Sequence, residues 1–134
     1  MSDMNFGDQL MRWANKRKVS MHKAIAMTAI RLGANIIERT PIDTGRAKGN
    51  WMSAYGSADT GTSETRTQNE ALQGLRVKFT VAQVAQNTSL LITNSLPYII
   101  ELEQGKSKQA PAGMVRLSIL EFKQILEQET RSAN

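Results

Sequence analysis

Residues 20–46 read SMHKAIAMTAIRLGANIIERTPIDTGR, and this stretch decides the fold. Ser20 is a suitable helix N-cap, because its hydroxyl can accept a hydrogen bond from an amide of the first helical turn. Residues 21–39 contain no proline, and Gly33 alone interrupts good helix formers. Pro41 disfavours helical geometry at Thr40. The stretch therefore predicts a helix from Ser20 to Arg39 that ends just before Pro41.

Apolar side chains cover most of the circumference of this predicted helix. They recur at helical spacing, with only a narrow polar stripe between them. The apolar positions are Met21, Ile25, Ala29, Leu32 and Ile36, widened by Ala26, Ile30 and Ile37, and the polar stripe is Thr28, Arg31, Asn35 and Glu38. Such a helix packs on more than one side. We expect its own sheet on one side and a neighbouring subunit on the other.

Beyond this helix, the sequence predicts short elements and polar turns. Asp43-Thr-Gly45 forms a turn, since Asp can bond its own downstream backbone and Gly adopts positive φ without steric cost. Residues 47–55, with Trp51 and Tyr55, predict a strand. Residues 56–69 hold no large apolar side chain, so we expect a mobile loop.

The second half of the chain predicts a helix over residues 77–86 and a strand over 88–93. Residues 98–102 predict a further strand or extended rim segment, in which Glu101 and Glu103 would project from one face. After a basic, polar loop at 105–113, residues 114–130 predict an amphipathic helix. Its stripe is Val115, Ile119, Phe122 and Leu126, joined by Leu120 and Ile125.

This order of elements predicts an α+β fold. A small antiparallel sheet packs against a long helix from the N-terminal half and a C-terminal helix. We expect residues 1–19 to be an arm or short helix and residues 20–134 to be a single domain.

Composition and charge restrict the function classes. The chain has 134 residues and a formal net charge of +5, and it has no Cys, which excludes disulfides. The excess of positive charge lies in residues 1–50 and is densest at Arg12, Lys16, Arg17 and Lys18. These four are candidate DNA-facing residues, or else they dock on an acidic neighbour. No export signal or membrane-spanning run is expected, so the protein is made in the cytoplasm and acts without a membrane.

The sequence predicts no catalytic residue, cofactor or metal site. Asp43-Thr-Gly45 matches the tripeptide of aspartic proteases, in which two chains would each supply one carboxylate. That family sets the tripeptide after a hydrophobic strand, whereas Glu38-Arg-Thr-Pro-Ile precedes it here. His22 is the single histidine and has no cysteine to join it in a metal site, so we expect a surface histidine. A turn is the favoured interpretation of Asp43.

Two separated segments resemble a known family. The first is Thr40-Pro-Ile-Asp-Thr-Gly-Arg46, closed by Trp51. The second is Asn94-Ser-Leu-Pro-Tyr-Ile-Ile-Glu-Leu-Glu-Gln-Gly105, followed by Ser107-Lys-Gln-Ala-Pro-Ala-Gly-Met114. Together they resemble the tail-component and neck proteins of lambda-like siphophages, a tail-completion group akin to minor tail protein Z. The resemblance covers residues 20–122, and the second segment is the more specific.

The resemblance implies a non-enzymatic virion protein of a long-tailed bacteriophage. It would form a homo-oligomeric ring, expected to be a hexamer, at the head–tail junction, for tail completion or head–tail joining. Its partners would be copies of itself, neighbouring neck and tail proteins, and DNA in the channel. The interface and turn candidates are Pro41, Asp43, Thr44, Gly45, Arg46, Trp51, Pro97, Tyr98, Glu101, Gly105, Lys108, Pro111 and Met114. The alternative is a small basic nucleic-acid-binding protein.

Overall fold

The computed structural model describes residues 5–42, 46–86 and 89–132. Within these ranges the chain forms seven helices and a two-stranded antiparallel sheet, which confirms the α+β class. The elements are α1 (Phe6–Arg17), α2 (Met21–Arg39), α3 (Arg46–Gly49), β1 (Met52–Tyr55), α4 (Gln68–Lys78), α5 (Val81–Gln86), β2 (Leu90–Thr93), α6 (Ile99–Glu103) and α7 (Val115–Ser132).

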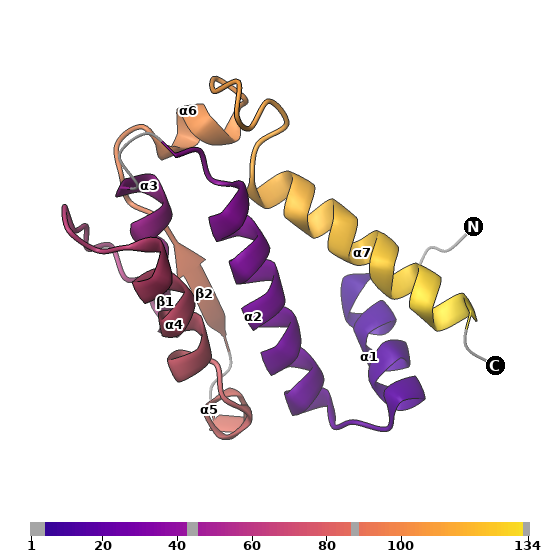
Figure 1. Ribbon diagram of the computed structural model, residues 1–134. Coiled ribbons are helices and arrows are strands. Elements are labelled where there is room, and N and C mark those ends of the chain that lie inside the picture. Colours follow the sequence, from indigo (N-terminus) through magenta and orange to yellow (C-terminus); the bar gives the residue numbers. More distant parts are fainter. Residues whose placement is uncertain (1–4, 43–45, 87–88, 133–134) are drawn as a thin grey trace.

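Helix α2 runs through the centre of the molecule, with the sheet and α4 on one side and α1 and α7 on the other (Figure 1). Its predicted ends are confirmed. The Ser20 hydroxyl accepts a hydrogen bond from the Lys23 amide at 3.1 Å, and Thr40 caps the C-terminus in an extended conformation just before Pro41. The same view shows α6 and the following loop above the C-terminal end of α2.

Two hydrophobic clusters flank α2, and one of them corrects a prediction. The first joins α2 to the sheet, α4 and the loop before α7, through Ile36, Ile37, Trp51, Ala71, Leu75, Phe79, Ala110 and Met114. The second joins α2 to α1 and α7, through Leu10, Ala14, Ala24, Phe122 and Leu126. The expectation that a neighbouring subunit covers the second side of α2 is therefore wrong, because α1 and α7 of the same chain cover it. Thr28, predicted on the polar stripe, is buried too.

The sheet is shorter than the sequence predicted. Strands β1 and β2 pair antiparallel in the register Met52↔Thr93 to Tyr55↔Leu90. The predicted strand over 47–55 is wrong at its start, because residues 46–49 form the short helix α3. The fully buried Asn50 side chain explains this. Its amide nitrogen donates to the Arg46 carbonyl at 2.7 Å and to the Ser63 carbonyl at 2.8 Å, which holds the chain in a turn.

Helix α4 was not predicted: it begins at Gln68, inside the loop expected over 56–69, and its end at Lys78 breaks the helix expected over 77–86. Thr67 and Glu70 form a capping box, in which each side chain accepts a hydrogen bond from the other residue's backbone amide. Close packing then fixes α4 against α2, since a Cβ on Gly33 would lie 2.5 Å from a Leu75 methyl carbon. The short helix α5 follows, and it covers most of the helix predicted over 77–86.

Two further predictions in the second half are corrected. The strand or rim segment expected at 98–102 is helix α6, so Glu101 and Glu103 do not project from one face. In α7, Phe122 and Leu126 are buried as predicted, but Ser118 takes the next inward position. Ile119, Leu120 and Ile125 are 41%, 52% and 39% exposed, because α7 contacts α1 and α2 along one narrow face.

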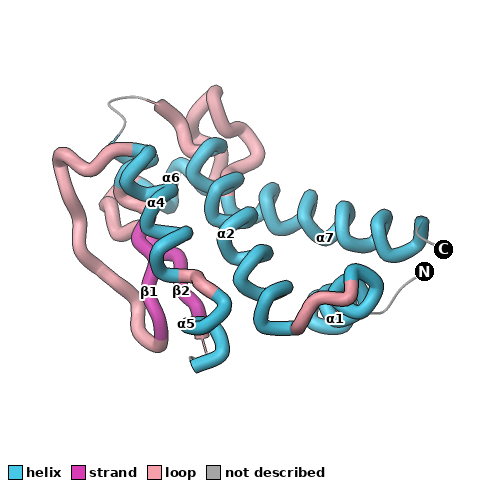
Figure 2. The backbone as a smooth tube through the Cα atoms, turned by 60° about the horizontal axis from the view of Figure 1, so that its bottom comes forward, coloured by secondary structure: helices cyan, strands magenta, loops and turns pink. Residues whose placement is uncertain are grey.

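The loop at 56–67 and helix α1 lie at opposite ends of the molecule in both views (Figures 1 and 2). The loop is exposed for most of its length, yet hydrogen bonds tie it to the body. The Ser63 amide donates to the Asn50 side chain at 2.7 Å, and the Thr93 hydroxyl donates to the Asp59 carbonyl at 2.7 Å. Mobility of this loop stays a prediction, which these bonds oppose.

Candidate subunit interface

The end of helix α2 is fixed from inside the molecule by Thr40 and Trp51. The Thr40 hydroxyl donates to the Ile36 carbonyl at 2.7 Å, and the indole nitrogen of Trp51 donates to the Thr40 oxygen at 2.8 Å. Both residues are buried. The sequence makes Trp51 an interface candidate, but the structure places it in the core, where it anchors the end of α2.

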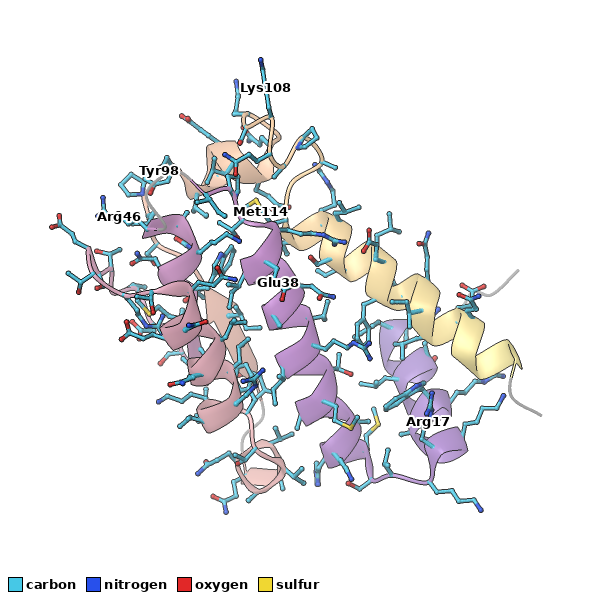
Figure 3. All side chains as sticks on the ribbon, in the orientation of Figure 1. Arg17, Glu38, Arg46, Tyr98, Lys108 and Met114 are labelled. Atoms are coloured by element: carbon cyan, nitrogen blue, oxygen red, sulfur yellow. The ribbon has the colours of Figure 1, made fainter. Side chains whose placement is uncertain are left out.

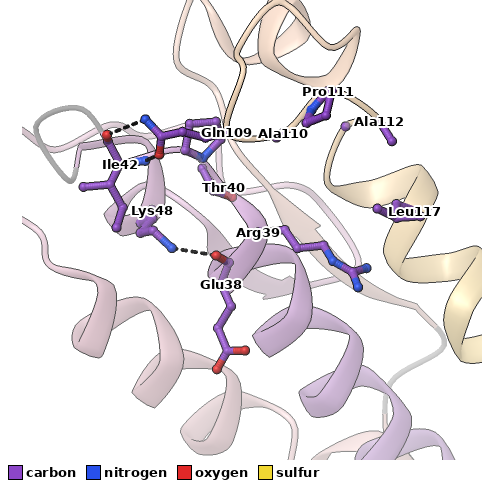
Figure 4. A pocket seen from close by; sticks show the side chains of 12 residues that line it. Glu38, Arg39, Thr40, Ile42, Lys48, Gln109, Ala110, Pro111, Ala112 and Leu117 are labelled. Carbon is purple, nitrogen blue, oxygen red and sulfur yellow. Dashed lines mark hydrogen bonds between the residues drawn. The ribbon is translucent and has the colours of Figure 1, made fainter.

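Lys48 is a residue of the candidate site that sequence reasoning missed. Its side chain is 5% exposed, and its ammonium donates to the carbonyls of Ile37 at 3.1 Å and Glu38 at 2.8 Å (Figure 4). It thereby satisfies carbonyls that a helix C-terminus leaves unpaired. Burial lowers the pKa of Lys48 below its usual value, and the charge of Glu38 raises it in partial opposition. The signal in the sequence was a lysine placed shortly after a helix end.

The two family-like segments meet at this end of the molecule. The Gln109 side chain accepts a hydrogen bond from the Ile42 amide at 2.8 Å and donates to the Ile42 carbonyl at 3.0 Å (Figure 4). The Asn94 side chain donates to the Ala47 carbonyl at 2.9 Å. Each bond joins one segment to the other. We call this end of the molecule, formed by residues 40–42, 46–48 and 94–114, the motif end.

Glu103 holds the second segment in shape. Its carboxylate accepts three hydrogen bonds, each 2.9 Å long, from the backbone amides of Met114, Val115 and Arg116 at the start of α7. Burial raises the pKa of Glu103, but these bonds and the nearby Arg116 charge outweigh it, so the pKa lies below its usual value. The ionised carboxylate therefore caps α7 and closes the loop between α6 and α7 at its base.

Glycines permit the same closure. Gly105 and Gly113 adopt positive φ angles of 88° and 84°. A Cβ on Gly105 would lie 2.4 Å from the Pro111 carbonyl oxygen, and one on Gly113 would lie 2.4 Å from the Glu103 carbonyl oxygen. At the base of the loop, the backbone near Glu103 and Gly105 approaches the backbone near Pro111 and Gly113 too closely for a side chain on either glycine.

Two clefts and three exposed apolar side chains mark the surface of the motif end. One cleft, of about 260 Å³, lies between the end of α2 and residues 109–113 (Figure 4). The other, of about 330 Å³, is lined by Pro41, Tyr98, Leu102 and Lys106 among others. Ile42, Tyr98 and Ile100 are 61%, 36% and 66% exposed. These clefts and exposed apolar side chains make the motif end a candidate contact surface.

The remaining sequence candidates divide between surface and interior. Figure 3 shows Tyr98 and Arg46 at the motif end and Lys108 extending from its tip. Pro97, Glu101 and Pro111 are exposed, Gly105 is half-buried, and Pro41 and Met114 are buried. Asp43, Thr44 and Gly45 lie outside the described residues, so the predicted turn and the protease alternative stay untested. Residues 40–42, which follow helix α2, precede this gap, and helix α3 begins directly after it.

The four basic candidates lie far from the motif end. Arg12, Lys16 and Arg17 belong to α1, Lys18 follows it directly, and all four are exposed. Figure 3 shows Arg17 at the end of the molecule opposite Tyr98. The structure therefore separates the two sets of candidates that the sequence singled out.

The described residues hold no group of three His, Asp or Glu side chains that could bind a metal ion. No helix among them is long and apolar enough to cross a membrane. His22 is exposed at the start of α2. The motif end presents a partly apolar surface held by side-chain hydrogen bonds.

Comparison with protein-family models, with curated proteins and with solved structures gave no match.

Proposed function

We propose that this chain is a structural, non-enzymatic virion protein of a long-tailed bacteriophage. Copies of it assemble into a ring, expected to be a hexamer, at the head–tail junction. The observation that supports this most is the convergence of the two family-like segments, through Gln109–Ile42 and Asn94–Ala47, on one partly apolar surface. The segments resemble those of neck and tail-completion proteins, and their meeting gives that resemblance a structural role.

A closed ring requires two different contact surfaces on each subunit, because a head-to-tail contact joins unlike faces. The motif end supplies one, where Ile42 and Tyr98 line the two clefts and Ile100 is exposed. We assign the other to α7, where Leu120 is 52% exposed on the outer side and the half-exposed Ile119 and Ile125 flank the buried stripe on opposite sides. Grouped apolar side chains on a surface mark sites of association. The motif end of one copy therefore packs against α7 of the next.

Paired substitutions test this arrangement. Ile100→Glu breaks the first surface and Leu120→Glu the second, while Val77→Glu, at a 72% exposed position on α4, is the matched control. Each of the first two variants alone should stay monomeric at concentrations where the control forms the ring. An equimolar mixture of the two should yield a heterodimer, because one intact contact remains between them, but no ring. Rings formed by either variant alone would refute the proposed contact.

The place in the virion is tested by electron microscopy of phage particles with an antibody against this chain. Label at the head–tail junction is the expected result. Label on the capsid shell or distal tail tip, or particles that carry no copy of the chain, would refute the proposal.

A further inference from the structure

We infer that α1 and the first turn of α2 form a binding surface for the phosphate backbone of duplex DNA. Between Phe6 and Lys23 the chain carries five cations and a single acid, Asp8. The cations are Arg12, Lys16, Arg17, Lys18 and Lys23, and all are exposed. We call these five residues the basic end. This inference deepens the proposed function by naming the polymer that the ring surrounds.

These charges come from two elements that meet at one corner of the molecule (Figure 1). Arg12, Lys16 and Arg17 occupy the second half of α1, whose C-terminus favours positive charge. Lys23 enters from the other side of the corner, in the first turn of α2. The Arg17 guanidinium lies 5.6 Å from the centre of the Trp13 ring, a cation–π contact that holds it against the body.

Lys18 adds a second, independent observation. It has φ 58° and ψ 40°, and it is the one non-glycine residue with positive φ in the described chain. Glycine is the usual residue at such a helix end, because a side chain there costs about 1 kcal/mol. Retaining lysine at this position costs stability and adds a cation at the centre of the basic end. Strain of this kind is a mark of functional positions.

The chemistry of this surface fits nucleic acid better than a second protein. The apolar side of α1, with Leu10 and Ala14, is buried against α2 and α7, so it is not available to a partner. The exposed side has Met11 as its large apolar residue and is otherwise polar or charged. Protein interfaces are depleted of lysine and charge at their centres, whereas DNA interfaces are strongly positive and wet.

The charged residues of α7, the helix packed on α1, limit how strongly the basic end can bind DNA. Helix α7 packs on α1 and carries Lys123 and Glu127 among its charged residues, while its Glu121 is paired with Arg39 of α2. Four or five phosphate contacts per subunit are therefore the most that the basic end offers. Binding should be independent of base sequence, with a slope of log K against log salt of about −3.5 to −4.5 per subunit.

The test uses the full chain, a fluorescent 30-base-pair duplex of arbitrary sequence, and fluorescence anisotropy across a range of KCl concentrations. The triple variant Arg12→Gln, Lys16→Gln, Lys18→Gln removes three contacts. It should reduce the salt slope by about 2.7 and the affinity at 0.1 M salt on the order of a hundredfold. The control Arg31→Gln, Arg76→Gln, Lys78→Gln removes the same charge at exposed positions elsewhere. It should leave the salt slope unchanged and alter the affinity by no more than about twofold.

A single substitution separates DNA contact from folding. Lys18→Gly should raise the melting temperature, because glycine relieves the positive φ, and should still weaken DNA binding. The inference would be overturned if the Arg12, Lys16, Lys18 triple variant and the control triple variant lost DNA binding equally, or if binding did not depend on salt. Loss of self-assembly in the Arg12, Lys16, Lys18 triple variant would also overturn the inference, since the basic end would then be a contact between protein subunits. A monomer that binds DNA would refute the ring alone, and a ring that ignores DNA would refute this inference alone.

Discussion

The side-chain amide of Gln109 pairs with both backbone polar groups of Ile42, 67 positions earlier in the chain. One bond is accepted and one donated, as between neighbouring strands. This contact joins Ile42, which follows α2, to the loop before α7, and Ile42 is exposed at the motif end. The geometry of the proposed subunit contact therefore depends on two hydrogen bonds from a single glutamine.

Gln109→Ala should destabilise the fold by about 1–2 kcal/mol, since it removes both bonds. For a chain of this size, that lowers the melting temperature by roughly 3–8 °C. Gln124→Ala, at an exposed position on α7, is the matched control and should leave the melting temperature nearly unchanged. Calorimetry of the two variants measures the difference. Equal melting temperatures for Gln109→Ala and Gln124→Ala would show that the bonds between Gln109 and Ile42 do not stabilise the fold.

Glu103→Gln should cost about 1 kcal/mol of unfolding free energy at pH 7, because a neutral amide is a weaker cap for α7. The pKa of Glu103 is lowered in the folded state, so its contribution is present above the unfolded value of about 4.3. It is lost as the pH falls through the lowered folded value. The difference between wild type and variant should therefore shrink towards pH 3.

Urea denaturation at pH 7, 5 and 3 measures that difference. Glu101→Gln, at an exposed position of the same helix, is the control and should show little effect at any of the three. A cost for Glu103→Gln that stays constant over the whole range would contradict the capping role of its charge.

Asn50→Ala should release the loop at 56–67 and destabilise the fold by about 2–3 kcal/mol. The Asn50 side chain is fully buried and bonds to Arg46 and to both backbone groups of Ser63. Its loss leaves buried polar groups unpaired. Hydrogen exchange should become much faster at the Ser63 amide, while Asn69→Ala, at an exposed position on α4, should not alter it. Unchanged protection of that amide in Asn50→Ala would show that other contacts hold the loop.

Local signals allowed much of the fold to be predicted. The Ser20 cap, Pro41 and the apolar periodicity located α2, and Leu90 to Thr93 gave a strand, because these signals act within a few residues. Helix α3 was not predictable in this way. It depends on Lys48 and Asn50, whose partners are set by the tertiary structure. The Thr67–Glu70 capping box was visible in the sequence and would have placed the start of α4.

The candidate site was predictable in its parts but not in its assembly. The two segments could be singled out from their turn residues, but nothing local shows that Gln109 reaches Ile42. The apolar run Tyr98–Leu102 suits a strand or a helix equally. The Glu103 cap on α7 is the contact that selects α6. The separation of the basic end from the motif end likewise appears only when α1 packs on α7.

Native mass spectrometry of the purified full chain, alone and after mixing with purified tail tubes, tests the central claim most directly. The account predicts one closed assembly, expected at six times the 14.9 kDa subunit mass, that Ile100→Glu abolishes and Val77→Glu leaves intact. A chain that stays monomeric under both conditions would contradict it.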